Sequence, residues 1–140
     1  MIRSLVLAVC LLTAPVPSPV GSGFAPGDGF DGHWGVDLSA PVGTPVAAPA
    51  DGLVTFAGSV AGMRSVTLDH GGGLRTSVSY LSEIFVVVGQ RVRSGDPIGR
   101  AGEPHGVPGV HLSARRAGTY VDPVPLLDCL DGVIRLVPDR

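Results

Sequence analysis

The chain has 140 residues, of which 44% are hydrophobic and only 16% are charged. These values are typical of one small folded domain and argue against a disordered chain. The formal net charge is -2, and the sequence contains no run of basic residues. Composition therefore gives no support for nucleic-acid binding or for attraction to anionic polymers.

An apolar run near the amino end predicts an export signal. Arg3 is followed by the apolar residues 5–12 and then by a small and proline-rich stretch over residues 13–23. This order is typical of a signal peptide, and the apolar run is too short to span a bilayer. We therefore expect a signal peptide over residues 1–20 and a short linker over residues 21–28. We also expect a secreted or cell-envelope protein without a transmembrane span after signal removal.

Glycine and proline divide the rest of the chain into short segments. The 21 Gly and 13 Pro indicate a turn-rich, all-β protein with little or no helix. The run Gly71-Gly72-Gly73 predicts a tight hairpin between two strands. Residues 128–140 form a tail with one more strand-like run. In chain order, the predicted strands cover residues 53–56, 65–69, 74–80, 84–88, 91–93, 98–100 and 110–115.

Two short patterns suggest a metal site. His33 and Asp37 are four residues apart, so an extended chain places both on one face, as a nitrogen and an oxygen ligand suitable for zinc. Alone, this pattern is weak, because His and Asp at this spacing are more often solvated loop residues. His111 and Ser113 share one face of a predicted strand. A His at the position of Ser113 would aim a second imidazole at the same metal.

Residues 31–127 resemble the lysostaphin/LytM-type zinc metallopeptidase family nearly end to end. The resemblance implies the duplicated hybrid motif, an antiparallel β-sandwich with an active groove walled by loops, and a domain over residues 29–127. The segments that carry it are His33-Trp34-Gly35-Val36-Asp37-Leu38, Gly43-Thr44-Pro45-Val46, Asp51-Gly52-Leu53-Val54, His70-Gly71-Gly72-Gly73-Leu74-Arg75-Thr76, Val88-Gly89-Gln90-Arg91-Val92, Gly95-Asp96-Pro97-Ile98-Gly99, His111-Leu112 and Tyr120-Val121-Asp122-Pro123.

The resemblance also implies roles for individual residues. In that family zinc is held by the His and Asp of the first motif and by the second His of a His-x-His, whose first His is catalytic. His33 and Asp37 match two ligands, and His111 matches the catalytic position. The third ligand position falls on Ser113. A further catalytic His belongs to a Tyr-x-His-Leu segment, and that position falls on Tyr80.

These two replacements predict a weakened metal centre. Catalytic zinc needs about three protein ligands and an open position for water. A neutral hydroxyl at Ser113 is a poor ligand for zinc, and losing one ligand costs about 3 to 4 kcal/mol of binding free energy. Tyr80 can donate a hydrogen bond to an oxyanion, but a phenol does not replace an imidazole base at neutral pH. We therefore expect zinc to bind weakly or not at all.

Two functions follow as hypotheses. The favoured one is a non-catalytic envelope protein that binds peptidoglycan stem or cross-bridge peptides, or that docks onto a cell-wall hydrolase and regulates it. The resemblance implies this role because family members without zinc ligands are known as regulators of cell-wall amidases. A carrier of a lysine-linked cofactor is excluded, because the chain contains no Lys.

The alternative is an active zinc endopeptidase that cleaves peptidoglycan cross-links with a rebuilt site. His33, Asp37 and His105 would hold zinc, His111 would act as the base, and Tyr80 would donate to the oxyanion. His105 lies in the glycine-rich loop of residues 102–109, which leads into the His111 strand. A solvated loop His is the more common situation, because ordering such a loop costs conformational entropy.

Overall fold

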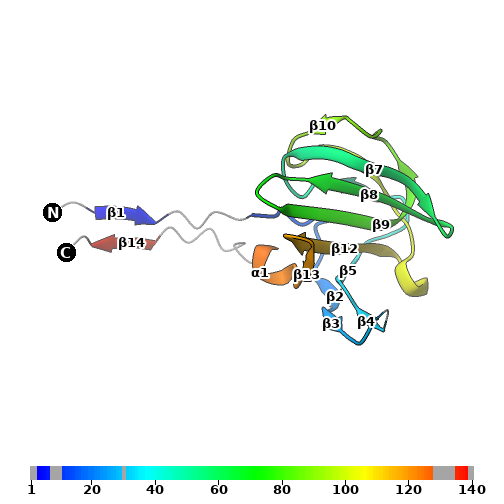
Figure 1. Ribbon diagram of the computed structural model, residues 1–140, viewed down its shortest axis with the longest axis horizontal. Helices are drawn as coiled ribbons and strands as arrows, with labels where there is room; N and C mark the ends of the chain where they lie inside the picture. The colour runs from blue at the N-terminus through cyan, green and yellow to red at the C-terminus, as the bar shows by residue number, and fades with distance from the viewer. Residues whose placement is uncertain (1–2, 7–10, 30, 128–134, 139–140) are drawn as a thin grey trace.

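The computed structural model of the chain describes residues 3–6, 11–29, 31–127 and 135–138, and their regular secondary structure is almost entirely antiparallel β-structure (Figure 1). The predicted all-β fold with little or no helix is confirmed. Helical geometry within these residues is confined to the 3-10 turn η1 (Pro104–Gly106) and the helix α1 (Val124–Leu127). The strands are β1 (Arg3–Val6), β2 (Val20–Ser22), β3 (Ala25–Pro26), β4 (Gly32–His33), β5 (Val36–Ser39), β6 (Pro45–Ala47), β7 (Gly52–Val60), β8 (Met63–Asp69), β9 (Leu74–Ile84), β10 (Arg91–Val92), β11 (Pro97–Ala101), β12 (Gly109–Arg116), β13 (Thr119–Val121) and β14 (Arg135–Pro138).

The main sheet has the strand order β10-β7-β8-β9-β12-β5-β2 (Figure 1). Strand β9 changes its partner along its length: residues 74–79 pair with β12, and residues 81–84 pair with β11. The change occurs at Tyr80, whose φ of 63° is left-handed. This bend directs the second half of β9 toward β11 and β6, so that the sheet folds over its own apolar face.

Most of the predicted strands are present, with shifted ends. The glycine hairpin is also present: three consecutive glycines with positive φ connect β8 to β9, and the His70 N–H donates to the Leu74 carbonyl at 2.9 Å. The predicted strand over residues 84–88 is wrong. Ile84 ends β9, and the following residues form a turn closed by the Gln90 N–H on the Val87 carbonyl. Val87 is 68% exposed, so a β-branched residue here has no core to pack against.

Alternation along the central strands separates two chemically different faces. Val66, Leu68, Val78, Val110 and Leu112 are at most 1% exposed and fill the core, as expected for every second residue of a strand. The opposite face of the same strands carries hydroxyl groups at residues 65, 67, 77, 79 and 113. The chemistry of the molecule is therefore on this second face.

The segment before the expected domain start also packs in the core. Leu12 and Val16 are 2% and 0% exposed, and the Leu12 N–H donates to the Leu126 carbonyl at 3.1 Å. Strand β2 adds to the edge of β5. The boundaries 1–20, 21–28 and 29–127 stay predictions, but the folded unit includes residues of the expected signal and linker.

The two ends of the chain pair with each other. β1 and β14 form a separate antiparallel ladder, in which Arg3 faces Pro138 and Val6 faces Arg135 (Figure 1). Part of the predicted tail therefore forms a strand, whereas its residues 128–134 and 139–140 lie outside the described residues. Across the described chain, no helix is long and apolar enough to cross a membrane.

Candidate metal centre

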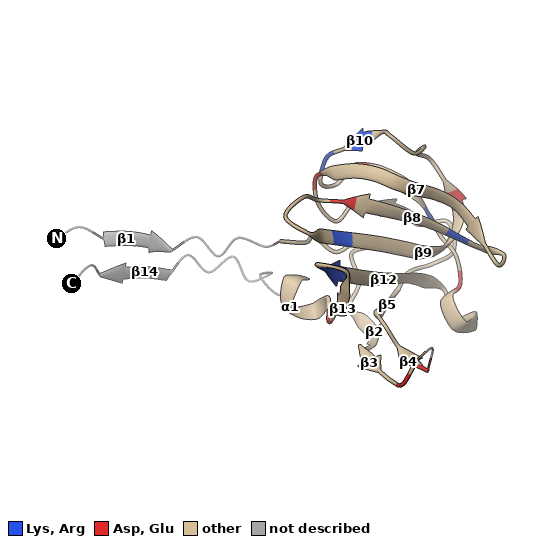
Figure 2. Cartoon of the chain, in the orientation of Figure 1, with Lys and Arg blue, Asp and Glu red and all other residues tan. Residues whose placement is uncertain are grey.

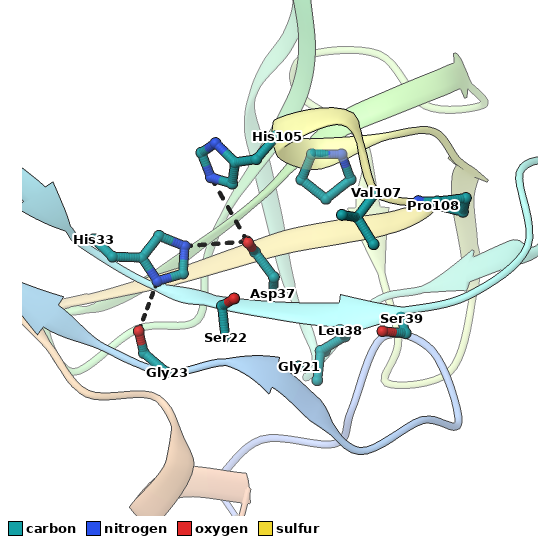
Figure 3. Close-up of a pocket in the computed structure, with 11 residues that line it drawn as sticks. Gly21, Ser22, Gly23, His33, Asp37, Leu38, Ser39, His105, Val107 and Pro108 are labelled. Carbon is teal, nitrogen blue, oxygen red and sulfur yellow. Dashed lines mark hydrogen bonds and ion pairs between the residues drawn. The ribbon is translucent and has the colours of Figure 1, made fainter.

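Three side chains converge where β4, β5 and β12 meet. Asp37 on β5 lies directly opposite His111 on β12, and the His111 Nδ1 is 2.8 Å from the Asp37 Oδ1. His33, at the end of β4, brings its Nε2 to 3.2 Å from the same oxygen (Figure 3). All three side chains are largely shielded from solvent, at 16% to 20% exposure. One carboxylate oxygen therefore lies between two imidazole nitrogens.

His105 adds a fourth donor from above this group. Its Nε2 lies 3.7 Å from the Asp37 Oδ2, and Figure 3 shows the ring directed toward the carboxylate. One donor atom from each of the four residues His33, Asp37, His105 and His111 lies within 4.8 Å of every other. His105 is the most exposed member, at 53%, because it comes from η1 rather than from a strand.

The ring of His33 is oriented by a backbone contact. Its Nδ1–H donates to the Gly23 carbonyl at 2.7 Å (Figure 3). Because this contact uses the Nδ1 proton, a neutral imidazole directs the Nε2 lone pair at Asp37. A lone pair and a carboxylate oxygen at 3.2 Å repel each other unless a proton or a metal cation lies between them. This arrangement is the one expected of a cation site.

His111 is held in a restricted space. Burial lowers its pKa from the ordinary value, an effect that the hydrogen bond to Asp37 opposes only in part. The lowered pKa favours the neutral imidazole that binds metals. Gly35 makes room for the ring: a Cβ at this position would lie 2.6 Å from the His111 Nε2 and 2.3 Å from the Leu112 carbonyl oxygen.

His105 and the neighbouring Tyr80 both have a strained backbone. Tyr80 and His105 have φ values of 63° and 53°, a conformation that is uncommon for residues other than glycine. Their ring centroids are 5.4 Å apart, and the Tyr80 ring lies 6.4 Å from that of His111. Backbone strain of this kind often concentrates at functional sites, where surrounding structure holds it in place.

A groove of about 370 Å³ extends from His111 along the hydroxyl-bearing face of the sheet. Two aromatic pairs line it: Trp34 and Tyr120, with ring centroids 5.8 Å apart, and Tyr80 and His105, with ring centroids 5.4 Å apart. Hydroxyl groups make up the floor, where the Ser65 and Ser79 oxygens are 3.0 Å apart. A second cavity of about 590 Å³ opens on the other side of His33, toward β2. The four donors therefore lie between two open spaces.

The structure places the predicted site residues in two groups. His33, Asp37, His105 and His111 meet at one point, whereas Ser113 lies two residues further along β12, opposite Ser77. The third ligand atom beside those of His33 and Asp37 thus comes from His111, and the hydroxyl of Ser113 belongs to the groove floor. Neither Gly23 nor Gly35 was predicted from the sequence as a residue of the site. The place of Gly35 between His33 and Asp37 was the available signal.

Comparison with known proteins agrees with this geometry. Residues 31–123 match the model of peptidase family M23, and this span covers more than half of the chain. The chain belongs to peptidase family M23. It is 41% identical over 95 residues to the DD-carboxypeptidase/endopeptidase Mpg of Neisseria meningitidis, covering 66% of this chain and 22% of that protein. It is also 39% identical over 86 residues to the peptidoglycan DD-endopeptidase ShyA of Vibrio cholerae, covering 57% and 19%.

A solved structure supports the same assignment. The antimicrobial peptidase lysostaphin from Staphylococcus simulans superposes with a TM-score of 0.71 and 30% sequence identity, over 79% of this chain and 50% of that one. The predicted resemblance to lysostaphin-type peptidases is therefore confirmed. The chain spans about a fifth of the length of the curated relatives described above, so the match concerns the M23 domain.

Proposed function

We propose that this domain is a metal-dependent peptidase that cleaves peptide bonds of peptidoglycan, and that His33, Asp37 and His111 hold its zinc ion. The observation that carries the proposal is the pair of imidazole nitrogens at 3.2 Å and 2.8 Å from one Asp37 oxygen. Tetrahedral zinc with bonds of about 2.0 to 2.1 Å separates its ligand atoms by about 3.3 Å. The donor set and its spacing fit zinc without a change of fold.

This proposal departs from the expectation of only two ligand positions. The resemblance assigned the third ligand position to Ser113, whose hydroxyl is a poor zinc ligand. In the structure, His111 supplies a nitrogen directly opposite Asp37. When bound, zinc lowers the pKa of a coordinated water to about 7 and polarises a substrate carbonyl. Gly23 and Gly35 help to position the ligands. The Gly23 carbonyl orients the ring of His33, and Gly35 makes room for the ring of His111.

Two residues beside the donors are suited to proton and oxyanion chemistry. His105 is exposed and 3.7 Å from the Asp37 Oδ2, so it is placed to take up a proton or to bind the cation. Tyr80 lines the groove with its ring 5.4 Å from that of His105 and 6.4 Å from that of His111, and its hydroxyl is a hydrogen-bond donor for developing negative charge. The groove floor offers hydroxyl groups to the backbone of an extended peptide.

Peptidoglycan is proposed as the substrate because of the relatives. Two of them carry names that specify DD-endopeptidases, one of them a peptidoglycan enzyme. Secretion or location in the cell envelope follows as part of the proposal, because this substrate lies outside the cytoplasm. The groove beside His111 is open and combines serine hydroxyl groups with aromatic side chains, which suits a peptide ligand.

A non-catalytic role remains the second candidate function, and Tyr80 is the observation that favours it. A phenol stands where the resemblance places a catalytic imidazole. In that case the same groove binds peptidoglycan peptides, or docks a cell-wall hydrolase, without cleaving the peptide.

Zinc analysis combined with a digestion assay separates the two functions. The purified protein is stripped with EDTA, reloaded with zinc and analysed for metal content, and then incubated with purified peptidoglycan. We expect one zinc ion per chain and zinc-dependent release of new amino groups, both of which His33→Ala abolishes. Zinc binding without cleavage supports the non-catalytic role. A chain that does not retain zinc contradicts the proposed metal centre.

A further inference from the structure

A row of charged residues crosses the far end of the hydroxyl-bearing face. Arg115 on β12 lies directly opposite Arg75 on β9, and Arg75 lies opposite Asp69 on β8. Figure 2 shows these charges side by side at the same end of three neighbouring strands. In strand register this row follows the hydroxyl groups of Ser113 and Ser77. The face is thus neutral along the groove and positively charged at its end.

The charges in this row do not balance. Arg75 is paired with the only carboxylate of the row, since its Nη2 is 3.4 Å from the Asp69 Oδ2. Arg115 instead packs over the ring of Tyr120 at 5.7 Å, and none of the ion pairs among the described residues involves it. Like charges directly opposite each other destabilise a sheet. A bound anion between the two arginines would remove this repulsion.

The row is continuous with the groove of the metal centre. His111, Ser113 and Arg115 alternate along β12 and therefore share one face. Tyr120 links the two regions, because its ring lines the groove and also contacts Arg115. Arg115 follows His111 by four positions along β12, which corresponds to about 13 Å. An extended peptide bound along the groove covers this distance with about four residues.

We propose that Arg75 and Arg115 form a subsite for a carboxylate of the peptide ligand, about four residues from the metal centre. The guanidinium group presents its N–H donors in a planar fork that matches a carboxylate. This inference rests on the proposed function in one respect, namely that the ligand of the groove is a peptide. It adds to that function a preference for peptides with a free carboxylate at a defined distance from the site of cleavage.

Equilibrium binding of two synthetic stem peptides tests this subsite. The peptides differ only in their terminal group, which is a free carboxylate in one and an amide in the other. Trp34 is the single tryptophan of the chain and lines the groove, so its fluorescence reports binding. The protein is kept free of metal with EDTA, so that cleavage does not interfere. We expect the free acid to bind about five- to tenfold more tightly than the amide.

Three variants assign this preference to the arginine pair. Arg115→Gln and Arg75→Gln should bind both peptides with the affinity of the amide, and Arg115→Lys should restore part of the preference for the acid. Arg116→Gln is the matched control, because Arg116 is the next residue of β12 and lines a different cavity with His70. This variant should keep the full preference. Thermal melting checks that each variant is folded.

Several results would overturn the proposal. These are equal affinities of the wild type for the two peptides, an equal loss for both peptides in Arg115→Gln, or no binding of either peptide. Competition by inorganic phosphate that is stronger than competition by acetate assigns the subsite to phosphate groups instead. The binding measurement is made without metal, so its result does not depend on the zinc analysis. If the wild-type chain prefers the free acid but does not bind zinc, the subsite is supported and the proposed peptidase is contradicted.

Discussion

The identity of the third zinc ligand is the prediction that most directly tests the proposed metal centre. We expect His111→Ala to weaken zinc binding strongly and Ser113→Ala to leave it unchanged. His111 places its Nδ1 2.8 Å from Asp37, whereas Ser113 lies two residues away on the groove floor. A complete structural zinc site contributes about 10 to 16 kcal/mol over four ligands, so one ligand accounts for about 3 to 4 kcal/mol. Its loss should weaken binding by a factor of about 10² to 10³.

Thermal melting with and without zinc measures this loss. At a zinc concentration about 100 times the Kd, binding stabilises the folded chain by about 2.7 kcal/mol. For a domain of this size, that free energy corresponds to a rise in Tm of about 10 °C. At the same zinc concentration, His111→Ala should show a rise close to zero, and Ser113→Ala should show the full rise.

The comparison uses the difference between the two melting temperatures of each variant, so a change in the stability of the metal-free form does not affect it. This matters because His111→Ala also removes the hydrogen bond to Asp37. The reasoning is refuted if His111→Ala keeps the zinc-dependent rise while Ser113→Ala loses it. In that case the ligand position lies where the sequence resemblance placed it, and β12 changes register when the metal binds.

Two further predictions concern the surroundings of His111. Gly35→Ala should lower the free energy of unfolding by about 1 to 3 kcal/mol and remove the zinc-dependent rise in Tm. The reason is that the added Cβ clashes with the His111 ring and the Leu112 carbonyl. A variant whose Tm rises with zinc as much as that of the wild type would contradict this prediction. The free energy of unfolding of the metal-free form should be highest above about pH 6.5 and should decrease as the pH falls below that value. The pKa of His111 is lowered in the folded chain, so at these pH values the imidazole binds a proton more readily in the unfolded chain. Urea unfolding between pH 5 and pH 8 measures this, and His111→Asn should flatten the profile.

Local patterns predicted the central strands because those patterns are complete within a few residues. Residues 65–69 of β8 and 110–115 of β12 alternate between apolar and polar side chains, and three glycines mark the hairpin between β8 and β9. Residues 84–88 show why the same reasoning fails elsewhere. They have the β-branched composition of a strand, but whether they pair depends on distant segments. The bend at Tyr80 directs β9 to β11 and ends the ladder at Ile84.

In the site, too, sequence spacing predicted which residues share a face, whereas the pairing of distant strands was not predictable from it. The spacing of His33 and Asp37 predicted that both reach one metal, and the structure brings them together. Strand alternation also placed His111 and Ser113 on one face. It did not say which of the two lies opposite Asp37, because that depends on the register of β12 against β5. The structure pairs His111 with Asp37, and this single register decides whether two or three ligands are available.

The amino-terminal segment presents the strongest conflict between composition and packing. Residues 11–16 are apolar enough to predict part of a signal peptide, yet Leu12 and Val16 are buried in the core. Hydrophobicity does not distinguish the two, since both a signal and a core segment avoid water. We predict that a chain beginning at residue 11 has the Tm of the whole chain. A chain beginning at residue 21 should be about 4 kcal/mol less stable, because each buried side chain contributes about 2 kcal/mol. Equal melting temperatures for the two chains would show that the buried segment is dispensable and that the predicted boundary at residue 20 is compatible with the fold.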